Sequence, residues 1–211
     1  EIRKNNPNFI ELCLNNKLTT EITLQPIKRF DLDAAIIFSD ILMLPYGLKQ
    51  KVEFKKSFGP ILGELSVSAM SKLDEIDFIE QVYPVYKAIK SVSSEMYLKN
   101  KNTIGFIGAP WTLLVYMINQ QSPKKNVKKN FFEDEYLINR VLLIIEKFLK
   151  IHIKHQIKNG ANIIQIFDSW AGLLEEKDLP DYIYTPTSKL VDYVKSLNVP
   201  VICFPREIKN Y

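Results

Sequence analysis

Three short motifs place polar residues where apolar runs of strand length come to an end. They are FSD at 38–40, GAPWT at 108–112 and FDSWAG at 167–172. If these runs form parallel strands, the motifs meet at one edge of the sheet, where α/β proteins bind their ligands. Asp40 is then the leading candidate for chemistry, because a carboxylate ending a buried strand is either paired structurally or directed at a ligand. Spacing alone leaves both interpretations open.

Other residues near these motifs have a structural alternative as well. Asp168 and Ser169 could cap a helix, and Tyr116 could be a core tyrosine with one satisfied hydrogen bond. If Tyr116 instead lies one turn into a helix after GAPWT, its hydroxyl faces the same strand ends. Gly108 and Gly172 permit a tight turn or a close ligand approach, and a turn is the commoner explanation.

The remaining reactive side chains do not form a recognisable site. His152 and His155 lie three residues apart in a long helical segment, and we expect a partly exposed pair on an outer helix. Cys13 and Cys203 fit neither a disulfide framework nor zinc spacing, so we expect two reduced thiols. No phosphate-binding loop, dinucleotide fingerprint or nucleophile elbow surrounds Ser169 or any other residue.

The elements that must position these motifs alternate between strands and helices. Four buried strands are expected, separated by helical segments: Ala34–Phe38, Thr103–Ile107, Asn162–Phe167 and Pro200–Phe204. Buried strands joined by helical crossovers predict an α/β fold with a parallel sheet. Four such strands fit either a small open sheet or half of a (β/α)8 barrel.

The expected helices differ in how clearly the sequence marks them. Helical spacing is densest over 131–158, while Pro84 suggests that 75–99 forms two pieces. Further helices are expected within 5–29, from Leu113 to Asn119 with Pro110 near the start, and from Ser188 to Leu197. The stretch after Tyr46 and the basic stretch 120–130 are expected to be loops.

Composition favours an ordinary globular protein with one domain over residues 1–211. The 211 residues are 46% hydrophobic and 25% charged, with a net charge of +4. That charge is too small to indicate nucleic-acid binding, and no apolar run has the length of a membrane span. We divide the domain into N-terminal helices at 1–33 and β/α units at 34–211.

Taken together, three segments resemble the uroporphyrinogen decarboxylase family. They are LTTEITLQPIKRFDLDAAIIFSDIL at 18–42, IGFIGAPWTLLVYMI at 104–118 and GANIIQIFDSWAGLL at 160–174, joined by FIELC at 9–13. The resemblance implies a (β/α)8 TIM barrel, of which this chain carries about the first half. It also implies a cytoplasmic homodimer of haem biosynthesis that removes four acetate carboxyl groups from uroporphyrinogen III, without a cofactor or metal, to give coproporphyrinogen III.

The resemblance assigns roles to individual residues of this sequence. Asp40 matches the catalytic aspartate that faces the pyrrole N–H groups, and Tyr116 and Ser169 match substrate-binding residues. Arg3 matches an arginine at the edge of the cleft in a less similar segment. Decarboxylation needs a pyrrole ring protonated at carbon, and a fixed carboxylate stabilises the cation that develops.

The substrate carries eight carboxylates, yet the three motifs contain no basic residue. The resemblance implies an arginine-bearing segment before this chain and a histidine after it. We therefore expect an internal portion of the enzyme that is inactive alone. Two alternatives remain: an inactive homologue that serves as a binding or assembly partner, and a zinc- and corrinoid-dependent methyltransferase using Cys203.

Overall fold

The computed structural model, which describes residues 2–123 and 132–208, contains a four-stranded parallel sheet. Its strands lie in the order β1 (Ala34–Ile36), β4 (Asn102–Gly108), β5 (Ile163–Asp168) and β6 (Val201–Pro205). Every neighbouring pair is parallel. The predicted α/β class and all four predicted strands are confirmed, with ends shifted by one or two residues.

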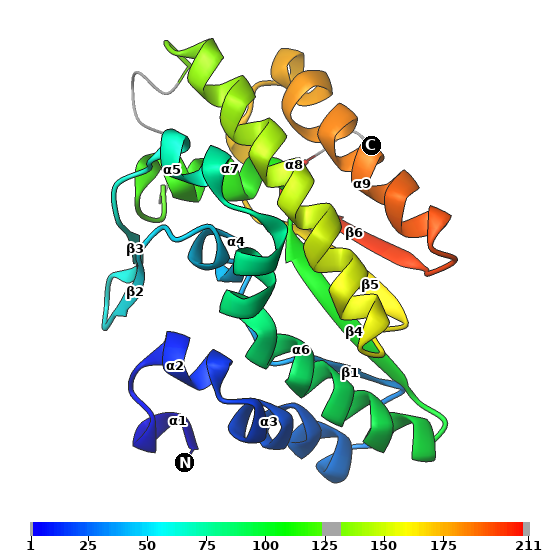
Figure 1. Ribbon diagram of the computed structural model, residues 1–211. Coiled ribbons are helices and arrows are strands. Elements are labelled where there is room, and N and C mark those ends of the chain that lie inside the picture. The colour runs from blue at the N-terminus through cyan, green and yellow to red at the C-terminus, as the bar shows by residue number, and fades with distance from the viewer. Residues whose placement is uncertain (1, 124–131, 209–211) are drawn as a thin grey trace.

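Long helices connect these strands and cover one face of the sheet (Figure 1). They are α6 (Glu75–Leu98), α8 (Glu135–Lys158) and α9 (Thr185–Ser196), and the shorter α7 (Pro110–Asn119) follows β4 directly. Three helices precede the sheet: α1 (Ile2–Asn5), α2 (Phe9–Leu14) and α3 (Asn16–Arg29). Smaller elements complete the described chain: α4 (Met43–Gly47), β2 (Val52–Lys55), β3 (Gly59–Leu62), α5 (Val67–Lys72), and single turns at Ala171–Leu173, Glu176–Asp178 and Pro180–Tyr184.

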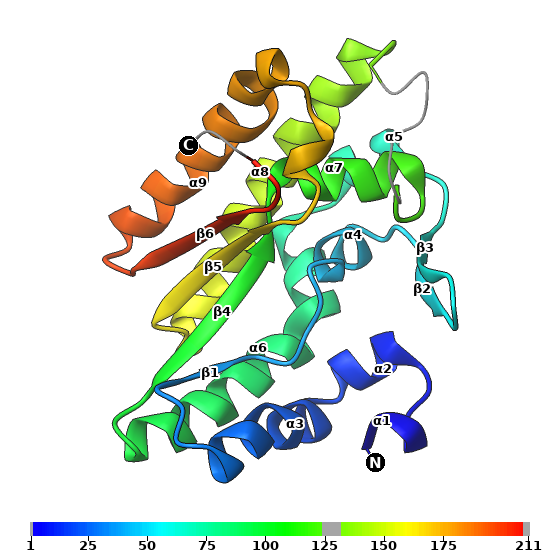
Figure 2. The ribbon, with the colours of Figure 1, turned by 180° about the vertical axis from the view of Figure 1, so that it is seen from behind.

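The two faces of the sheet differ in burial because side chains alternate along each strand. Ile164 and Ile166 point to the helices and are fully buried. The opposite face, which we call the open face, is turned toward the viewer in Figure 2 with no described helix running over β5 and β6. From the strand register, its side chains are those of Ile36, Ile104, Phe106, Ile163, Gln165, Phe167, Ile202 and Phe204. They are half-buried or exposed, and Phe204 is 54% exposed.

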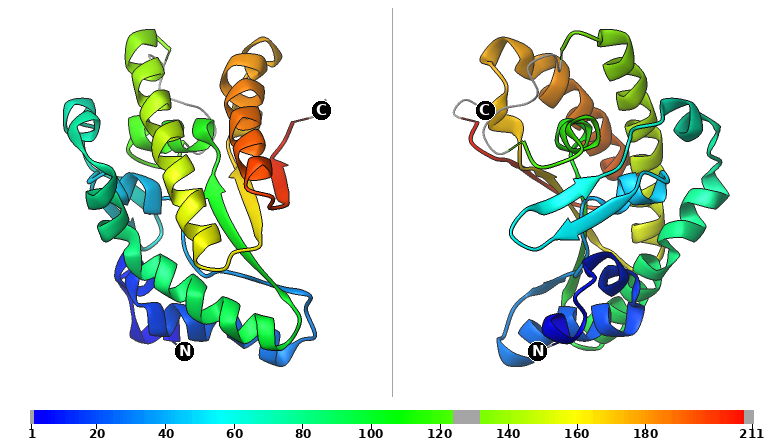
Figure 3. Two further views of the ribbon diagram at one scale, coloured as in Figure 1. Left: turned by 45° about the vertical axis from the view of Figure 1, so that its right-hand side comes forward. Right: turned by 90° about the vertical axis from the view of Figure 1, so that its left-hand side faces the viewer.

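Two expectations about local structure are wrong. Helix α6 is a single helix that contains Pro84, because Val82, Val85 and Tyr86 are buried against the core and hold both sides of the proline in one helix. The stretch after Tyr46, expected to be a loop, contains an antiparallel hairpin of β2 and β3. Figure 3 shows this hairpin projecting from the body of the molecule. Most of the expected basic loop at 120–130 lies outside the described residues.

No helix within residues 2–123 and 132–208 combines the length of a membrane span with a sufficiently apolar composition.

Candidate active site at the carboxyl ends of the strands

The segment that carries Asp40 separates from the sheet just before the carboxylate. Strand β1 keeps contact with β4 up to the Ile37 amide, which donates to the Ile104 carbonyl at 3.1 Å. The next amide, that of Phe38, donates instead to Thr23 Oγ1 of α3 at 2.9 Å. Helix α3 therefore holds the chain that leads to Asp40 away from the sheet.

The matching backbone groups of β4 are satisfied by a side chain from α8. Gln156 Oε1 accepts from the Phe106 amide and Gln156 Nε2 donates to the Phe106 carbonyl, both at 2.9 Å. A Cβ at Gly105 would lie 2.5 Å from Gln156 Oε1, so the glycine makes room for this contact. Gln156 takes the place of a strand partner, and β1 can diverge without leaving unpaired polar groups on β4.

Asp40 itself is half-buried, and its Oδ1 accepts a hydrogen bond from the Leu42 amide at 2.8 Å. Burial raises the pKa of Asp40 to about 6, although the Leu42 hydrogen bond favours the ionised form. No cation of the described chain forms an ion pair with this carboxylate. Oδ1 of Asp40 thus has a structural role, because it stabilises the turn to Leu42. The pKa of the Asp40 carboxyl group still lies near neutral pH.

Tyr116, on α7, lies within the electrostatic reach of Asp40. Burial raises the pKa of the Tyr116 hydroxyl, Trp170 lowers it by hydrogen bonding, and the negative charge of Asp40 raises it further. The tyrosine ring packs edge-on against Trp170, with 5.9 Å between ring centroids. The structure therefore brings the FSD and GAPWT motifs together and places FDSWAG beside them.

Ser169 lies between Asp168 and Trp170, which both form a hydrogen bond with the Thr112 hydroxyl. Thr112 Oγ1 donates to Asp168 Oδ1 at 2.6 Å and accepts from the Trp170 amide at 3.1 Å. Trp111 Nε1 also donates to the Trp170 carbonyl at 2.8 Å. Asp168 is therefore a buried hydrogen-bond partner of α7, and it does not cap the following turn Ala171–Leu173, whose N-cap is Trp170 without a side-chain hydrogen bond. Ser169 is half-buried at this strand end.

Gly108 and Gly172 both lie where neighbouring segments pack closely, and Gly172 also lies in the single turn Ala171–Leu173, as the turn interpretation expected. A Cβ at Gly108 would lie 3.0 Å from Leu113 and 3.1 Å from the Cβ of Ile41, next to Asp40. A Cβ at Gly172 would lie 2.6 Å from the Cβ of Glu207. Neither glycine has a positive φ. Their small size lets the strand ends approach each other.

Arg3 is linked to the segment that leads to Asp40 through Phe9, whose ring packs edge-on against Phe38 with 5.7 Å between centroids. Its Nη1 donates to the carbonyls of Asn6 and Pro7 at 2.6 and 2.8 Å, and its guanidinium lies 5.1 Å from the centroid of the Phe9 ring. Burial raises the pKa of the Cys13 thiol to about 12, with Asp40 raising it further and Arg3 lowering it. Both charges therefore act on the same buried thiol.

The two histidines differ from each other. His152 is buried, and its Nδ1 shares a 2.8 Å hydrogen bond with the Tyr86 hydroxyl. Burial lowers the pKa of His152 to about 3. The expectation of a partly exposed pair is wrong for His152, because α6 packs over it, while His155 is half-buried. Within residues 2–123 and 132–208, no group of three or more His, Cys, Asp or Glu side chains is arranged to hold a metal ion.

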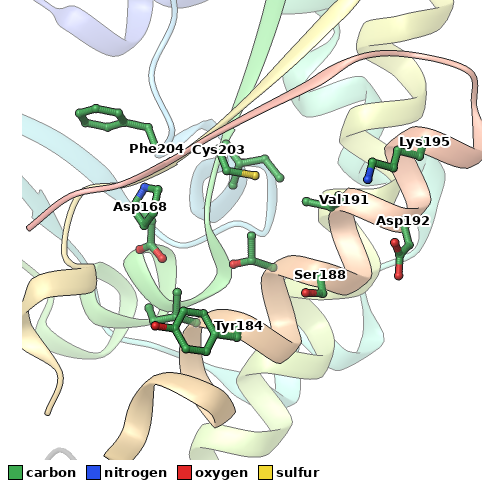
Figure 4. Close-up of a pocket in the computed structure, with 12 residues that line it drawn as sticks. Asp168, Tyr184, Ser188, Val191, Asp192, Lys195, Cys203 and Phe204 are labelled. Carbon is green, nitrogen blue, oxygen red and sulfur yellow. The ribbon is translucent and has the colours of Figure 1, made fainter. Parts of the chain in front are cut away.

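A cavity of about 440 Å³ lies on the helical side of the sheet, between β6 and α9 (Figure 4). Cys203 lines it together with Ser188, Asp192 and Lys195. Strand register places Cys203 beside Ile166, on the face opposite to Phe167 and Phe204. This cavity therefore lies mainly on the helical side of the sheet, although Phe204 of the open face also lines it, and the Cys203 side chain is on the helical side.

Three residues that hold the site were given no role by sequence reasoning: Thr23, Thr112 and Gln156. Thr112 is the last residue of GAPWT, a motif in which glycine and proline carry the stronger local signal. Gln156 could have been noticed, because it continues the buried stripe of Leu149 and Ile153 at helical spacing. A buried amide within an apolar stripe needs hydrogen-bond partners, and those partners are in β4.

Comparisons with known sequences indicate a single family. The sequence model of the uroporphyrinogen decarboxylase (URO-D) family matches residues 1–210. Uroporphyrinogen decarboxylase of Rickettsia bellii is 40% identical over 209 residues, covering 97% of this chain and 61% of the relative. The Campylobacter jejuni enzyme is 38% identical over 217 residues, covering 100% of this chain and 64% of the relative. The chain thus spans about three fifths of the length of these relatives.

A solved structure is similar in fold. A methyltransferase from Methanosarcina mazei superposes with a TM-score of 0.73 at 15% identity, over 96% of this chain and 60% of that one. At this identity the similarity concerns the fold alone. The match of the family's sequence model to nearly every residue shows that the chain belongs to the uroporphyrinogen decarboxylase family.

Proposed function

We propose that this protein acts as a uroporphyrinogen decarboxylase, which converts uroporphyrinogen III to coproporphyrinogen III by removing four acetate carboxyl groups. Family membership supports this reaction, as do curated relatives of that name at about 40% identity. The observation that carries the proposal is a half-buried carboxylate, Asp40, that has no cation partner in the described chain and stands at the carboxyl end of the sheet.

The surroundings of Asp40 suit a large ring with polar arms. The open face presents Phe106, Phe167 and Phe204, and the first two rings pack edge-on with 5.5 Å between centroids. An apolar surface of this kind can receive the hydrophobic body of a tetrapyrrole. The ring N–H groups then need acceptors, and an unpaired carboxylate is a strong one.

The proposed mechanism uses Asp40 as a fixed negative charge. Protonation of a pyrrole carbon makes the ring cationic, and the ring then accepts the electron pair of the C–C bond that breaks as carbon dioxide leaves. The former acetate carbon next takes up a proton to become a methyl group, and the ring carbon releases the proton that it had gained. Asp40, ionised above about pH 6, stabilises this cation more strongly than the neutral substrate ring. Tyr116 and Ser169 hold the ring and its carboxylate arms in position. Arg3 is the described basic residue that we propose for one of the arms.

We further propose the arrangement that the family resemblance suggests for the complete enzyme. The four-stranded sheet forms part of a (β/α)8 barrel, with residues 1–211 belonging to one domain and the open face toward the barrel interior. The complete enzyme works as a cytoplasmic homodimer in haem biosynthesis, without a cofactor. The apolar side chains on the open face support this arrangement, because they would be covered inside a closed barrel.

Anaerobic incubation with uroporphyrinogen III, followed by chromatography of the oxidised products, tests the proposal. We expect the complete enzyme to give intermediates with seven, six and five carboxyl groups and then the four-carboxyl product, and the 211-residue chain alone to leave the substrate unreacted. The Asp40→Asn variant of the complete enzyme should bind the substrate and convert it much more slowly. Recovery of unreacted substrate with the complete wild-type enzyme would contradict the proposed function, and turnover by the 211-residue chain alone would contradict the expectation that it is inactive.

The same incubation examines the alternative of a binding or assembly partner. That alternative is favoured by one observation: the three motifs contain no basic residue to bind the carboxylates of the substrate. Uroporphyrin fluorescence quenched by the protein, without any product, would support binding without turnover.

A further inference from the structure

Thr112 is a buried hydroxyl with both of its hydrogen-bonding capacities used across two motifs. It is fully buried at the third position of α7, where it donates to Asp168 Oδ1 and accepts from the Trp170 amide. Tyr116 follows Thr112 by four residues and therefore lies on the same face of α7. That face meets Trp170 twice, through the Thr112 hydroxyl and through the Tyr116 ring.

The partner of Thr112 is the carboxylate of Asp168, and such a group is rarely buried without a cation. Asp168 is 3% exposed, has no cation partner in the described chain, and its Oδ2 makes no hydrogen bond there. A buried carboxylate with one unsatisfied oxygen costs stability, because such groups are normally fully hydrogen-bonded. A leucine at this position would avoid that cost, but it would leave the Thr112 hydroxyl without its acceptor. We therefore explain the Asp168 carboxylate by the Thr112 hydroxyl that it orients, and not by a contribution to the stability of the fold.

The backbone on either side of Ser169 is fixed by several contacts. The Asp168 carbonyl accepts from the Arg206 amide at 3.0 Å, and the Phe167 carbonyl accepts from the Ala109 amide at 2.8 Å. The Trp170 carbonyl accepts from Trp111 Nε1 at 2.8 Å. Only the amide of Trp170 depends on a side-chain hydroxyl, and that hydroxyl is oriented by Asp168.

We propose that Thr112 and Asp168 form a positioning pair that fixes Ser169 and Tyr116 relative to each other for substrate binding. The inference rests on the decarboxylase function proposed above and assigns two residues to that site. Neither is a catalytic residue: Asp168 points to the helical side of the sheet, and Thr112 is enclosed. They act through Ser169 and Tyr116, whose spacing the substrate arms must match.

The test compares four variants of the complete protein with uroporphyrinogen III. Thr112→Val keeps the shape and removes the hydroxyl, and we expect kcat/KM to fall roughly 10- to 100-fold, mainly through KM. Thr112→Ser keeps the hydroxyl and should restore most of the activity. Asp168→Ala should resemble Thr112→Val. As a matched control, Thr20→Val removes a helix-backbone hydrogen bond of 2.7 Å in α3 and should leave KM unchanged.

A double-mutant cycle separates positioning from a general loss of stability. In the Ser169→Ala background, Thr112→Val should cost much less in kcat/KM than it costs in the wild type, because the two changes remove the same contact. An equal factor in both backgrounds would overturn the proposal. If Thr112→Val does not fold, the Asp168→Ala and Ser169→Ala cycle answers the same question.

A measurement without substrate keeps this inference distinct from the proposed function. If the complete wild-type protein shows no turnover, the decarboxylase function is rejected before any variant is compared. Amide hydrogen exchange of residues 167–172 should still become faster in Thr112→Val than in Thr20→Val, with the rest of the sheet unchanged. Unchanged exchange in this segment would reject the positioning pair whatever the activity of the wild-type protein.

Discussion

At the scale of single residues, the proposed chemistry depends on Asp40. Its half-buried carboxylate has a pKa raised to about 6, so it is ionised at neutral pH and neutral in mild acid. Asp40→Asn keeps the size and the turn to Leu42 but removes the charge. We expect kcat to fall by a factor on the order of 100 to 1,000, as when a preorganised electrostatic contact to a transition state is lost.

Asp33→Asn is the matched control for this variant. Asp33 is exposed and directly precedes β1, so the same chemical change is made seven residues away from Asp40 without affecting the site. Steady-state turnover of both variants makes the comparison. An Asp40→Asn enzyme as fast as the Asp33→Asn enzyme would contradict the assignment.

The pH dependence of turnover gives a second prediction for Asp40. Because the ionised form is the one that stabilises the cationic ring, kcat/KM should decrease as pH falls through about 6. The acid limb should be absent from the residual activity of Asp40→Asn. A pH–rate profile from pH 5 to 8 checks this, and a flat profile of the wild-type enzyme would contradict it.

The buried carboxyl group of Asp168 should make the free energy of unfolding depend on pH. Burial raises its pKa from 3.8 to about 6, while the Thr112 hydrogen bond opposes the shift. The folded chain therefore keeps this proton up to about pH 6, whereas the unfolded chain releases it near 3.8. The contribution to stability is fully present below pH 3.8 and is lost as pH rises through 6.

Asp168→Asn removes this titration while leaving an oxygen to accept from Thr112. The free energy of unfolding of the variant relative to wild type should rise by about 2 kcal/mol between pH 4 and pH 7. Urea denaturation at the two pH values measures the difference. A constant offset at both values would mean that Asp168 is not titrating as a buried group.

At the scale of elements, the important feature is the separation of β1 from β4. It depends on Thr23 for the Phe38 amide and on Gln156 for Phe106. Gln156→Leu would leave the Phe106 amide and carbonyl without these partners. We expect a loss of on the order of 3 kcal/mol in the free energy of unfolding, since each unsatisfied buried group costs 1 to 3 kcal/mol.

Gln25→Leu provides the control for Gln156→Leu. Gln25 is exposed on α3, so the same substitution there removes no contact with the sheet. Chemical denaturation of both variants tests the prediction. Equal stability of the two would show that Gln156 does not replace a strand partner.

Most helices and strands could be predicted from the sequence, but the separation of β1 from β4 could not. The strands at β4, β5 and β6 were recognisable because buried parallel strands are runs of Ile, Phe and Val. The single helix through Pro84 and the β2–β3 hairpin were missed, since both depend on packing between distant segments. The use of Gln156 as a strand substitute could not be predicted, because it joins residues fifty positions apart.

At the scale of the whole molecule, one face of the sheet has helices and the other is open. Ile36, Ile202 and Phe204 are 43–54% exposed on or next to that face. The 211-residue polypeptide should therefore bind a hydrophobic dye such as ANS. Ile202→Ser with Phe204→Ser should reduce the fluorescence, whereas Phe58→Ser, at 74% exposure on the hairpin, should reduce it much less. Equal reductions would contradict a continuous apolar face.

The sequence by itself determined the alternation of strands and helices, the parallel sheet, and the three motifs that resemble one family. These follow from local patterns of apolar residues and from short contiguous motifs. Only the tertiary structure decided how Asp40 leaves the sheet, that Thr112 joins GAPWT to FDSWAG, and that His152 is buried. The physical reason is that burial and hydrogen bonding depend on contacts between segments far apart in the chain, which periodicity does not specify.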